Sequence, residues 1–356
     1  MSKKHKSPPT PAEDRPAPAE KPASPPHAAA SRARPSALLD TRVIYCGDNL
    51  EQLAKLPDAC IDLIYIDPPF NSNRNYEVFW GETKEKRAFE DRHASTQAYI
   101  DYMRPRCVEL ARVLKRTGSF YYHCDWHASH YVKCMLDQLF GENNFLNEII
   151  WKRTHSHGGA NRFGPVHDTI FLYAGSDKWT WNPQYSEYSD DYKEKFFRFA
   201  DADGKRYRLT ILTGTGTRNG SSGKPWRGVD PNKSGRHWAV PGYVRPLLPN
   251  PNTKTVQEAL DQLDKIGRVV WPYKKDGVPA FKQYLEDMEG TQLQSVWIDI
   301  PPISAQAQER LGYPTQKPLA LLDRIIKASS NPNDIVLDAF CGCGTALVAA
   351  QNLGRQ

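Results

Sequence analysis

The sequence predicts an α/β protein built on a doubly wound, largely parallel sheet. Apolar runs of strand length alternate with helical patterns between residues 42 and 177, and the same order resumes after about residue 300. Two of these strands end in a carboxylate followed by a turn. Such alternation is typical of parallel strands joined by helical crossovers, whose carboxyl ends carry ligand sites.

Most of the expected elements lie in the first half of the chain. Pro105 interrupts one helical pattern, so that helix begins near Pro105 or bends there. Residues 71–97 read as a polar, aromatic-rich loop. Strands are expected at 41–48, 60–67, 118–125, 145–154 and 168–175, and helices at 49–57, 100–114 and 129–141.

The second half of the chain has two different parts. Residues 178–300 are rich in Trp, Tyr, Gly, Pro and basic side chains, and only 255–267 shows a clear amphipathic helix. Residues 301–356 return to regular order. We therefore expect one α/β domain in two pieces, 41–177 and 301–356, separated by an inserted region. The last piece contains expected helices at 318–330 and 346–354 and a strand at 334–340.

The composition limits the classes of protein to which this chain can belong. With 39% hydrophobic residues the 356-residue chain can bury a sizeable core, and no apolar run approaches the length of a membrane span. Seven cysteines at scattered spacings fit reduced intracellular thiols better than a disulfide framework. Residues 1–40 are expected to be a disordered tail, because nine of the 28 prolines lie there with almost no large apolar residue.

The strand at 60–67 ends in an unusual way. Its apolar run is followed directly by Asp67, Pro68, Pro69 and Phe70. Proline donates no hydrogen bond to a sheet, so the strand must stop here, at the edge where α/β proteins bind ligands. These four residues are therefore candidates for a functional site, although Asp-Pro-Pro is also a common way to end a strand.

A second turn of this kind follows the strand at 334–340. Asp338 lies at the strand end, and Gly342 and Gly344 allow the backbone to approach a ligand closely. The turn lacks the third glycine of a dinucleotide site, because Leu347 stands in its place. Alone it fits a plain strand–helix corner, whereas together with the first turn it indicates a cofactor site.

The two turns together resemble the motifs of the amino-group DNA methyltransferases that use S-adenosylmethionine. The "DPPF" at 67–70 is similar to their catalytic motif, and the "DAFCGCGT" at 338–345 is similar to their cofactor loop. The order of catalytic motif, recognition region and cofactor loop resembles the circularly permuted β group. The "TQKP" at 315–318 and the "GD" at 47–48 resemble two further cofactor-contacting segments of that group.

The resemblance spans residues 41–356 and implies a Rossmann-like methyltransferase sheet with an inserted target-recognition region. It implies S-adenosylmethionine as methyl donor, no metal, and duplex DNA as substrate, in the cytoplasm beside the nucleoid. It leaves open a restriction subunit and a homodimer as partners. The cofactor-binding residues that it implies are Asp48, Thr315, Gln316, Lys317, Pro318, Asp338, Phe340, Gly342, Gly344 and Thr345.

The chemistry of this family needs the residue types of the first turn. An exocyclic amine is a poor nucleophile, because its lone pair is delocalised into the ring. The Asp67 carboxylate and the Pro68 carbonyl can accept its two hydrogens and hold that lone pair toward the methyl group. The two prolines keep these acceptors rigid, and Phe70 offers a stacking face for a base turned out of the duplex. Asp at the first position resembles the adenine-N6 members, with cytosine-N4 as the alternative.

The inserted region is expected to contact DNA. Between residues 201 and 245 there are nine Lys or Arg and three Asp, so the basic charge is concentrated there. An ordinary solvated insert with buried tryptophans is the alternative interpretation. The expected DNA-binding residues are Lys224, Trp226, Arg227, Arg236 and Trp238, with Tyr243 as a further candidate for stacking.

One cluster of potential metal ligands has a different interpretation. The segment "HCDWHASH" has three histidines, a cysteine and an aspartate, but no C-x-x-C complements it, so the sequence disfavours a zinc site. We expect His123 and Asp125 at a strand end, facing the same cleft as Asp67. His155 and His157 lie in a glycine-rich loop and face either the pocket or solvent.

The end of the sequence departs from the resembled family. Members continue after the last helix with a strand whose acidic end holds the cofactor ribose, whereas this sequence stops at Gln356. We therefore expect a fragment with weakened cofactor binding and reduced stability. Two rival functions stay open: an inactive DNA-binding remnant, and a methyltransferase of RNA or of protein glutamine. Asp67 argues against the glutamine version, since such enzymes usually carry Asn there.

Overall fold

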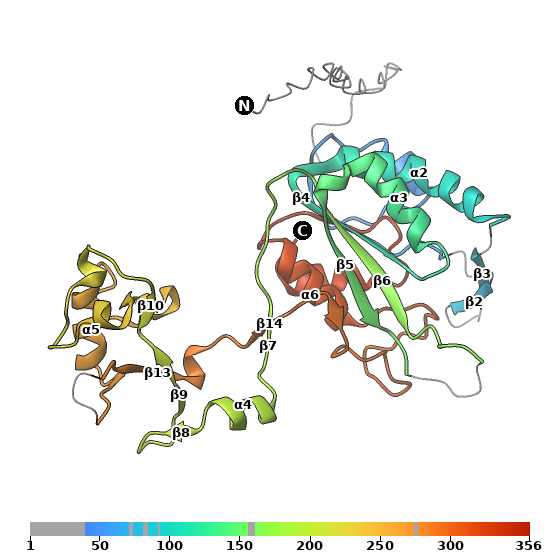
Figure 1. Cartoon of the computed structure of the whole chain (residues 1–356). Helices are drawn as coiled ribbons and strands as arrows, with labels where there is room; N and C mark the ends of the chain where they lie inside the picture. Colours follow the sequence, from blue (N-terminus) through green and yellow to red (C-terminus); the bar gives the residue numbers. More distant parts are fainter. Residues whose placement is uncertain (1–39, 71–73, 81–84, 92, 156–160, 274–276) are drawn as a thin grey trace, which may run out of the picture.

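The computed structural model describes residues 40–70, 74–80, 85–91, 93–155, 161–273 and 277–356. The expected N-terminal tail, apart from Asp40, and His157 lie outside these ranges. The chain forms a larger domain around a central sheet, with a smaller lobe beside it (Figure 1). No helix in the described ranges is long and apolar enough to cross a membrane.

The larger domain is organised around a six-stranded sheet. Its strands are β1 Ile61–Ile66, β4 Leu114–Cys124, β5 Phe145–Lys152, β6 His167–Ala174, β15 Val296–Trp297 and β16 Val336–Leu337. Their order is β15–β5–β6–β4–β1–β16. β1 is parallel to β4 and β16, and β15 to β5, but β6 runs antiparallel to both neighbours. The α/β class is confirmed, with a mixed sheet, because β6 follows β5 without a helical crossover.

Helices cover both faces of this sheet (Figure 1). One face packs against α1 Asn49–Leu53, α2 Thr96–Val113 and α3 Ser129–Phe140, and the other against α6 Leu319–Ser329 and α7 Thr345–Asn352. Side chains alternate along each strand, so β1 contributes to both cores. Its Ile64 and Ile66 belong to the first core, and its Leu63 and Tyr65 to the second.

Helix α2 does not begin at Pro105 but runs through it. The helix begins at Thr96, where the Ser95 side chain accepts a hydrogen bond from the Ala98 N–H. Its apolar face is buried, including Ile100 and Met103 before the proline. Packing of this face offsets the hydrogen bond that proline removes, as tertiary contacts commonly do for helices in proteins.

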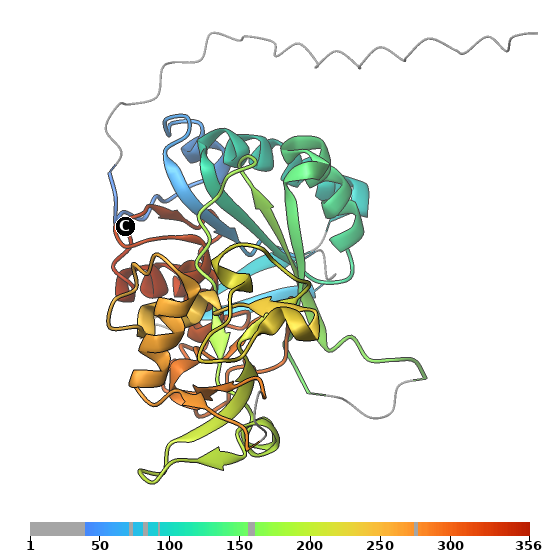
Figure 2. The same cartoon turned by 60° about the vertical axis from the view of Figure 1, so that its left-hand side comes forward.

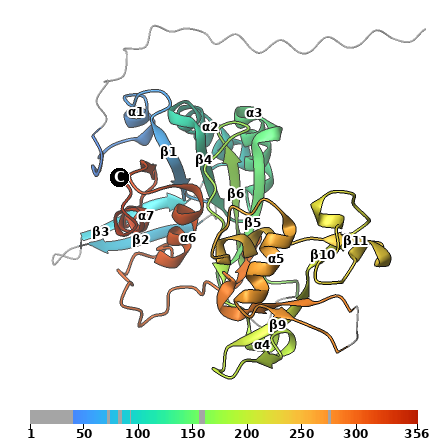
Figure 3. The ribbon, with the colours of Figure 1, turned by 90° about the vertical axis from the view of Figure 1, so that its left-hand side faces the viewer.

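Two expectations for the first half are wrong. Residues 41–48 form no strand: within the described chain no strand pairs with them, and Ile44 is 72% exposed. A short apolar run without a sheet neighbour does not hold a strand. The expected loop at 71–97 instead contains β2 Arg74–Trp80 and β3 Glu85–Asp91, which pair as an antiparallel ribbon (Figure 3).

The small lobe, residues 185–292, lies within the expected insert (Figure 2). Its two connections to the larger domain pair as β7 Tyr185–Ser186 and β14 Thr291–Gln292. Its own core gathers Trp226, Trp238 and the apolar side of α5 Val256–Lys265. Its strands are β8 Phe199–Ala200, β9 Arg206–Ile211, β10 Thr213–Thr215, β11 Arg236–Trp238, β12 Val269–Val270 and β13 Ala280–Tyr284, with helix α4 at Asp190–Phe196.

Short 3₁₀ helices complete the described secondary structure. One precedes β5 in the larger domain, and the others lie in the small lobe. They span Glu142–Asn144, Ser221–Gly223, Pro231–Ser234, Gly242–Leu247 and Leu285–Asp287.

Candidate active site

The carboxyl edge of the sheet brings the two sequence motifs together. Since β1 and β16 are parallel neighbours, Asp67 and Asp338, which follow them, lie at the same edge. A cavity of about 730 Å³ opens there, within the usual size range of small-molecule sites. The expected residues that line it are Asp67, Pro68, Pro69, Phe70, Thr315, Gln316, Lys317, Pro318, Asp338, Phe340, Gly342 and Thr345.

Asp48 does not line this cavity. Its carboxylate accepts a hydrogen bond from the Leu50 N–H at 2.8 Å, which caps α1, and pairs with Arg106 at 2.7 Å. The neighbouring Asn49 donates to the Ala339 carbonyl at 2.9 Å, which ties this segment to the turn after β16. Asp48 thus caps the helix in this structure, and its expected role in cofactor binding stays a prediction.

The glycine turn forms a cradle at one wall of the cavity. Gly342 has a φ of +52° and Gly344, which precedes α7, a φ of +84°, a region that favours glycine. A Cβ atom on Gly342 would lie 3.3 Å from the Tyr313 ring, so the ring packs closely on the bare backbone. Gly342 and Tyr313 together form one wall of the cavity in which the resemblance places the adenosyl cofactor.

Asp338 is a carboxyl group with an altered proton affinity. Burial raises the pKa of Asp338 to about 7, although its Oδ1 accepts a hydrogen bond from the Phe340 N–H at 2.9 Å. The negative charge of Asp67 acts in the same direction as burial, and Lys317 opposes it. Near neutral pH this carboxyl group is therefore present in both protonation states.

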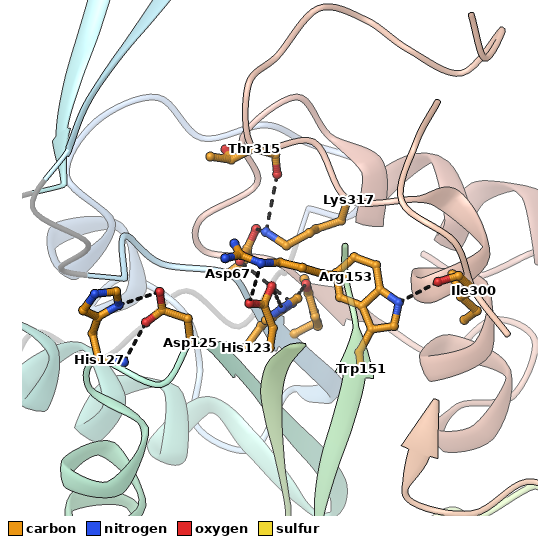
Figure 4. A network of polar contacts seen from close by, with 11 residues as sticks. Asp67, His123, Asp125, His127, Trp151, Arg153, Ile300, Thr315 and Lys317 are labelled. Atoms are coloured by element: carbon orange, nitrogen blue, oxygen red, sulfur yellow. Dashed lines mark hydrogen bonds and ion pairs between the residues drawn. The ribbon is translucent and has the colours of Figure 1, made fainter. Parts of the chain in front are cut away.

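The Asp67 carboxylate is only partly used by the protein. Its Oδ2 accepts a hydrogen bond from the Lys317 ammonium group (Figure 4). Its Oδ1 is buried without a hydrogen-bond partner among the described residues, and the nearest ring nitrogen of His123 is 3.9 Å away. A buried acceptor left unsatisfied costs free energy, so this oxygen is suited to a donor from a ligand.

His123 lies next to Asp67 in a fully buried polar network. Its Nδ1 hydrogen-bonds the Tyr65 hydroxyl at 2.8 Å, and its Nε2 hydrogen-bonds Asp168 at 3.1 Å. Since a carboxylate only accepts, Nε2 donates, and in the neutral ring Nδ1 accepts from Tyr65. Burial acts to raise the pKa of Asp168, but the hydrogen bond from His123 and the charge of Arg153, 3.1 Å away, hold this pKa below its usual value.

Several residues that line the cavity are not marked by any motif in the sequence. Trp151 and Arg153 come from the end of β5, and the Trp151 indole donates to the Ile300 carbonyl at 2.9 Å. Asp168 is the second residue of β6, and because β6 is antiparallel its beginning lies at the edge where the other strands of the sheet end. An aspartate opening an apolar run was the available signal. Tyr65 and Tyr313 also line the cavity.

The potential metal ligands of the segment "HCDWHASH" make separate contacts in the structure. His123 faces Asp67 as expected, whereas Asp125 turns to His127, accepting from its backbone N–H at 3.0 Å and contacting its ring at 2.8 Å (Figure 4). His155 is exposed. Among the described residues, no group of three or more His, Cys, Asp or Glu side chains could hold a metal ion.

The two tryptophans expected to contact DNA belong instead to the core of the small lobe. Trp226 and Trp238 are 3% and 1% exposed, and their rings meet edge to face. Their indole N–H groups donate to Asp261 at 2.9 Å and to the Lys224 carbonyl at 3.1 Å. The expectation of stacking on DNA is wrong for these two, because they supply the large apolar surface that a lobe of this size must bury.

The three expected cations of the lobe differ in their surroundings. Lys224 is exposed and has no ion-pair partner in the described part of the chain. Arg227 is exposed but pairs with Asp264. Arg236 donates to the hydroxyl of Thr213 at 2.7 Å and to its carbonyl at 3.0 Å. Lys224 is thus the cation of the three most available to a polyanion.

Comparisons with known proteins agree with this site. A family model described as DNA methylase matches residues 61–356. The chain is 30% identical over 295 residues to the type II methyltransferase M.EcaI of Enterobacter cloacae. It is 26% identical over 342 residues to the StyLTI Mod subunit, a type III restriction-modification enzyme of Salmonella typhimurium. It is also 26% identical over 318 residues to the DNA adenine methyltransferase YhdJ of Escherichia coli.

These alignments differ in how much of each relative they include. They cover 83%, 87% and 89% of this chain, but 60% of M.EcaI, 50% of the StyLTI Mod subunit and 77% of YhdJ. This chain therefore spans only half to three-quarters of the length of these relatives. The family model matches most of the sequence and includes both motifs of the cavity. The chain belongs to the DNA methylase family.

Proposed function

We propose that the chain transfers a methyl group from S-adenosylmethionine to the N6 amino group of adenine in duplex DNA. The observation that carries this proposal is the single cavity shared by the "DPPF" turn and the glycine turn. Asp67 Oδ1, without a hydrogen-bond partner among the described residues, supports a role as acceptor for the target amine. The name of the relative YhdJ, a DNA adenine methyltransferase, favours adenine over cytosine.

The residues of the first turn act on the amine. S-adenosylmethionine, when bound, would supply the methyl group that the amine nitrogen attacks, and its sulfur would keep the electron pair of the broken bond. Asp67 and the Pro68 carbonyl accept the amine hydrogens and aim the lone pair, and Asp67 is the nearest acceptor for the proton that leaves. Phe70 stacks on the extruded base.

The remaining expected residues divide between cofactor and DNA. The Gly342 backbone, the Tyr313 ring and the Asp338 carboxyl group would hold the cofactor, together with the segment at 315–318. The small lobe would contact DNA through Lys224 and through its exposed rings, of which Tyr243 is 46% exposed. A restriction subunit is a proposed partner, because the StyLTI relative is named as the Mod subunit of a restriction-modification enzyme.

The product of the reaction tests this proposal. The 356-residue chain, and a form extended by any residues that follow in its reading frame, are incubated with labelled S-adenosylmethionine and mixed-sequence duplex DNA. The digested nucleosides are then identified by mass. N6-methyladenine is the expected product. N4-methylcytosine would overturn the choice of base, and no methylated nucleoside from either form, with RNA as a parallel substrate, would overturn the proposed reaction.

A further inference from the structure

The Lys317 ammonium group occupies a central place in the cavity. Its Nζ atom pairs with Asp67 Oδ2, lies 5.1 Å from the centroid of the Phe70 ring, and lies 3.4 Å from the Thr315 carbonyl (Figure 4). The side chains of Lys317 and Asp67 are only 11% and 16% exposed. The two residues are far apart in the sequence, so this contact is made by the fold and not by a local turn.

These contacts coincide with those that the reaction requires of the target base. In the proposed mechanism the base must present N–H donors to Asp67 and lie against the ring of Phe70. The Lys317 ammonium group makes contacts of both kinds, since it donates to Oδ2 of the same carboxylate, beside the Oδ1 that has no hydrogen-bond partner in the described chain, and lies near the aromatic ring. We propose that Lys317 takes the place of the target amine in the free protein and must leave it before the base can enter.

A substitute for the target amine lowers the free energy of a site that holds no substrate. An ionised carboxylate with little exposure to water is destabilising unless it is paired. Asp67 already has one oxygen without a hydrogen-bond partner in the described residues, and without Lys317 both would lack one. The lysine therefore keeps the site folded and charged while no substrate is bound.

The chemistry of the cofactor provides a force that displaces the lysine. This inference rests on the proposed function, in which S-adenosylmethionine binds the same cavity. Its sulfonium carries a positive charge, which repels the ammonium group of Lys317 in an enclosed site. Its carboxylate also offers that ammonium group a new partner. Cofactor binding thus releases Asp67 and Phe70, and the base enters only afterwards.

The experiment measures entry of the base rather than catalysis. The methylated position is first mapped in DNA treated with the wild-type chain, and 2-aminopurine is placed there in a synthetic duplex. This analogue fluoresces when it leaves the stack and has no 6-amino group to methylate. For the wild type, we expect the affinity of the extruded state to rise at least about fivefold with S-adenosylmethionine. It should rise less with S-adenosylhomocysteine, whose sulfur is uncharged.

The Lys317→Met variant removes the ammonium group that takes the place of the target amine. We expect this variant to extrude 2-aminopurine without any cofactor, and added S-adenosylmethionine should change the signal less than twofold. The matched control is Lys133→Met, since Lys133 pairs with Asp137 at 2.7 Å and lies 4.0 Å from the Phe145 ring, outside the cavity. The control should keep the cofactor dependence of the wild type.

Two results would overturn the inference. One is a wild-type protein that extrudes the base equally well with and without S-adenosylmethionine, a measurement that needs no variant to fold. The other is a Lys317→Met protein with the full cofactor dependence of the wild type. Either result leaves adenine methylation intact, whereas a wild-type chain that methylates no adenine refutes the proposed function itself.

Discussion

Two groups of lysine, aspartate and phenylalanine in this molecule have the same composition and different surroundings. The helix group is Lys133, Asp137 and Phe145, and the pocket group is Lys317, Asp67 and Phe70. In the helix group, Asp137 accepts from Lys133 with both oxygens at 2.7 Å and from the Tyr173 hydroxyl at 2.7 Å. Every polar atom of that carboxylate is satisfied within the chain.

The carboxylate of the pocket group has fewer hydrogen-bond partners within the described chain than that of the helix group. One oxygen of Asp67 accepts from Lys317, the other has no hydrogen-bond partner in the described residues, and the residue lines the cavity. Satisfied polar groups hold a fold together, whereas an unsatisfied buried acceptor costs stability that only a ligand can return. The same residue types are thus structural in one place and suited to binding and catalysis in the other.

The largest effect, on the rate of methyl transfer, is expected from changing the Asp67 carboxylate. Asp67→Asn removes the charge that accepts the amine hydrogen, and loss of one preorganised polar contact typically lowers a rate by roughly 10²–10³-fold. Single-turnover methyl transfer measures this effect. Asp137→Asn is the control and should leave the rate within about twofold of the wild type. Equal losses in both variants would break the distinction between the two groups.

Asp168 also lines the pocket but differs from Asp67 in its partners, although its Oδ1 too is buried without a hydrogen-bond partner among the described residues. It hydrogen-bonds His123 and pairs with Arg153, each at 3.1 Å. Asp168→Asn should lower the free energy of unfolding by about 3 kcal/mol, since it removes the charged acceptor of the buried His123. Urea unfolding tests this. Asp299→Asn, which breaks an exposed pair with Arg324, should cost less than about 1 kcal/mol.

The two regions should also respond to pH with opposite signs. The pKa of Asp338 is raised to about 7, so the folded state holds this proton more tightly and loses stability as pH rises from about 4 to about 7. Lys133 and Tyr173 outweigh burial and lower the pKa of Asp137, so its contribution is lost only as pH falls below about 4.

Urea unfolding at pH 5 and pH 8 measures this difference. From Asp338 alone we expect the wild type to lose roughly 2 kcal/mol between these values. Asp338→Asn should remove this loss, and Asp137→Asn should retain it. A wild-type stability that rises over this range, and to the same extent in Asp338→Asn, would show that Asp338 does not carry the change.

The smallest effect is expected on the small lobe. Lys224→Ala should weaken duplex DNA binding by about 0.5–1 kcal/mol and reduce the slope of log affinity against log salt by about 1, with unchanged stability. Arg227→Ala, whose side chain already pairs with Asp264, should weaken binding less. Fluorescence anisotropy at several salt concentrations compares the two variants. A larger loss of DNA affinity for Arg227→Ala than for Lys224→Ala would contradict the expectation that a side chain already in an ion pair contributes less to DNA binding.

The two turns of the site could be predicted from the sequence because each contains residues that are typical of a turn. Pro68 and Pro69 end one strand, and Gly342 and Gly344 mark the other turn, whatever surrounds them. Asp168 was missed because its place depends on the antiparallel direction of β6, and Arg153 was missed because no local motif marks the end of β5. The expectations of a strand at 41–48 and of tryptophans that stack on DNA were wrong for a similar reason, because sheet pairing and burial depend on residues that are distant in the sequence.

The most direct test of the central claim measures the stability of two matched variants. Asp67→Asn and Asp137→Asn are unfolded in urea beside the wild type at pH 7. We expect Asp137→Asn to lose about 1–2 kcal/mol, because three charged hydrogen bonds are removed, and Asp67→Asn to lose less, because only its Oδ2 accepts a hydrogen bond from the described chain. If Asp67→Asn loses as much stability as Asp137→Asn, the Asp67 carboxylate belongs to the structural framework and the account is wrong.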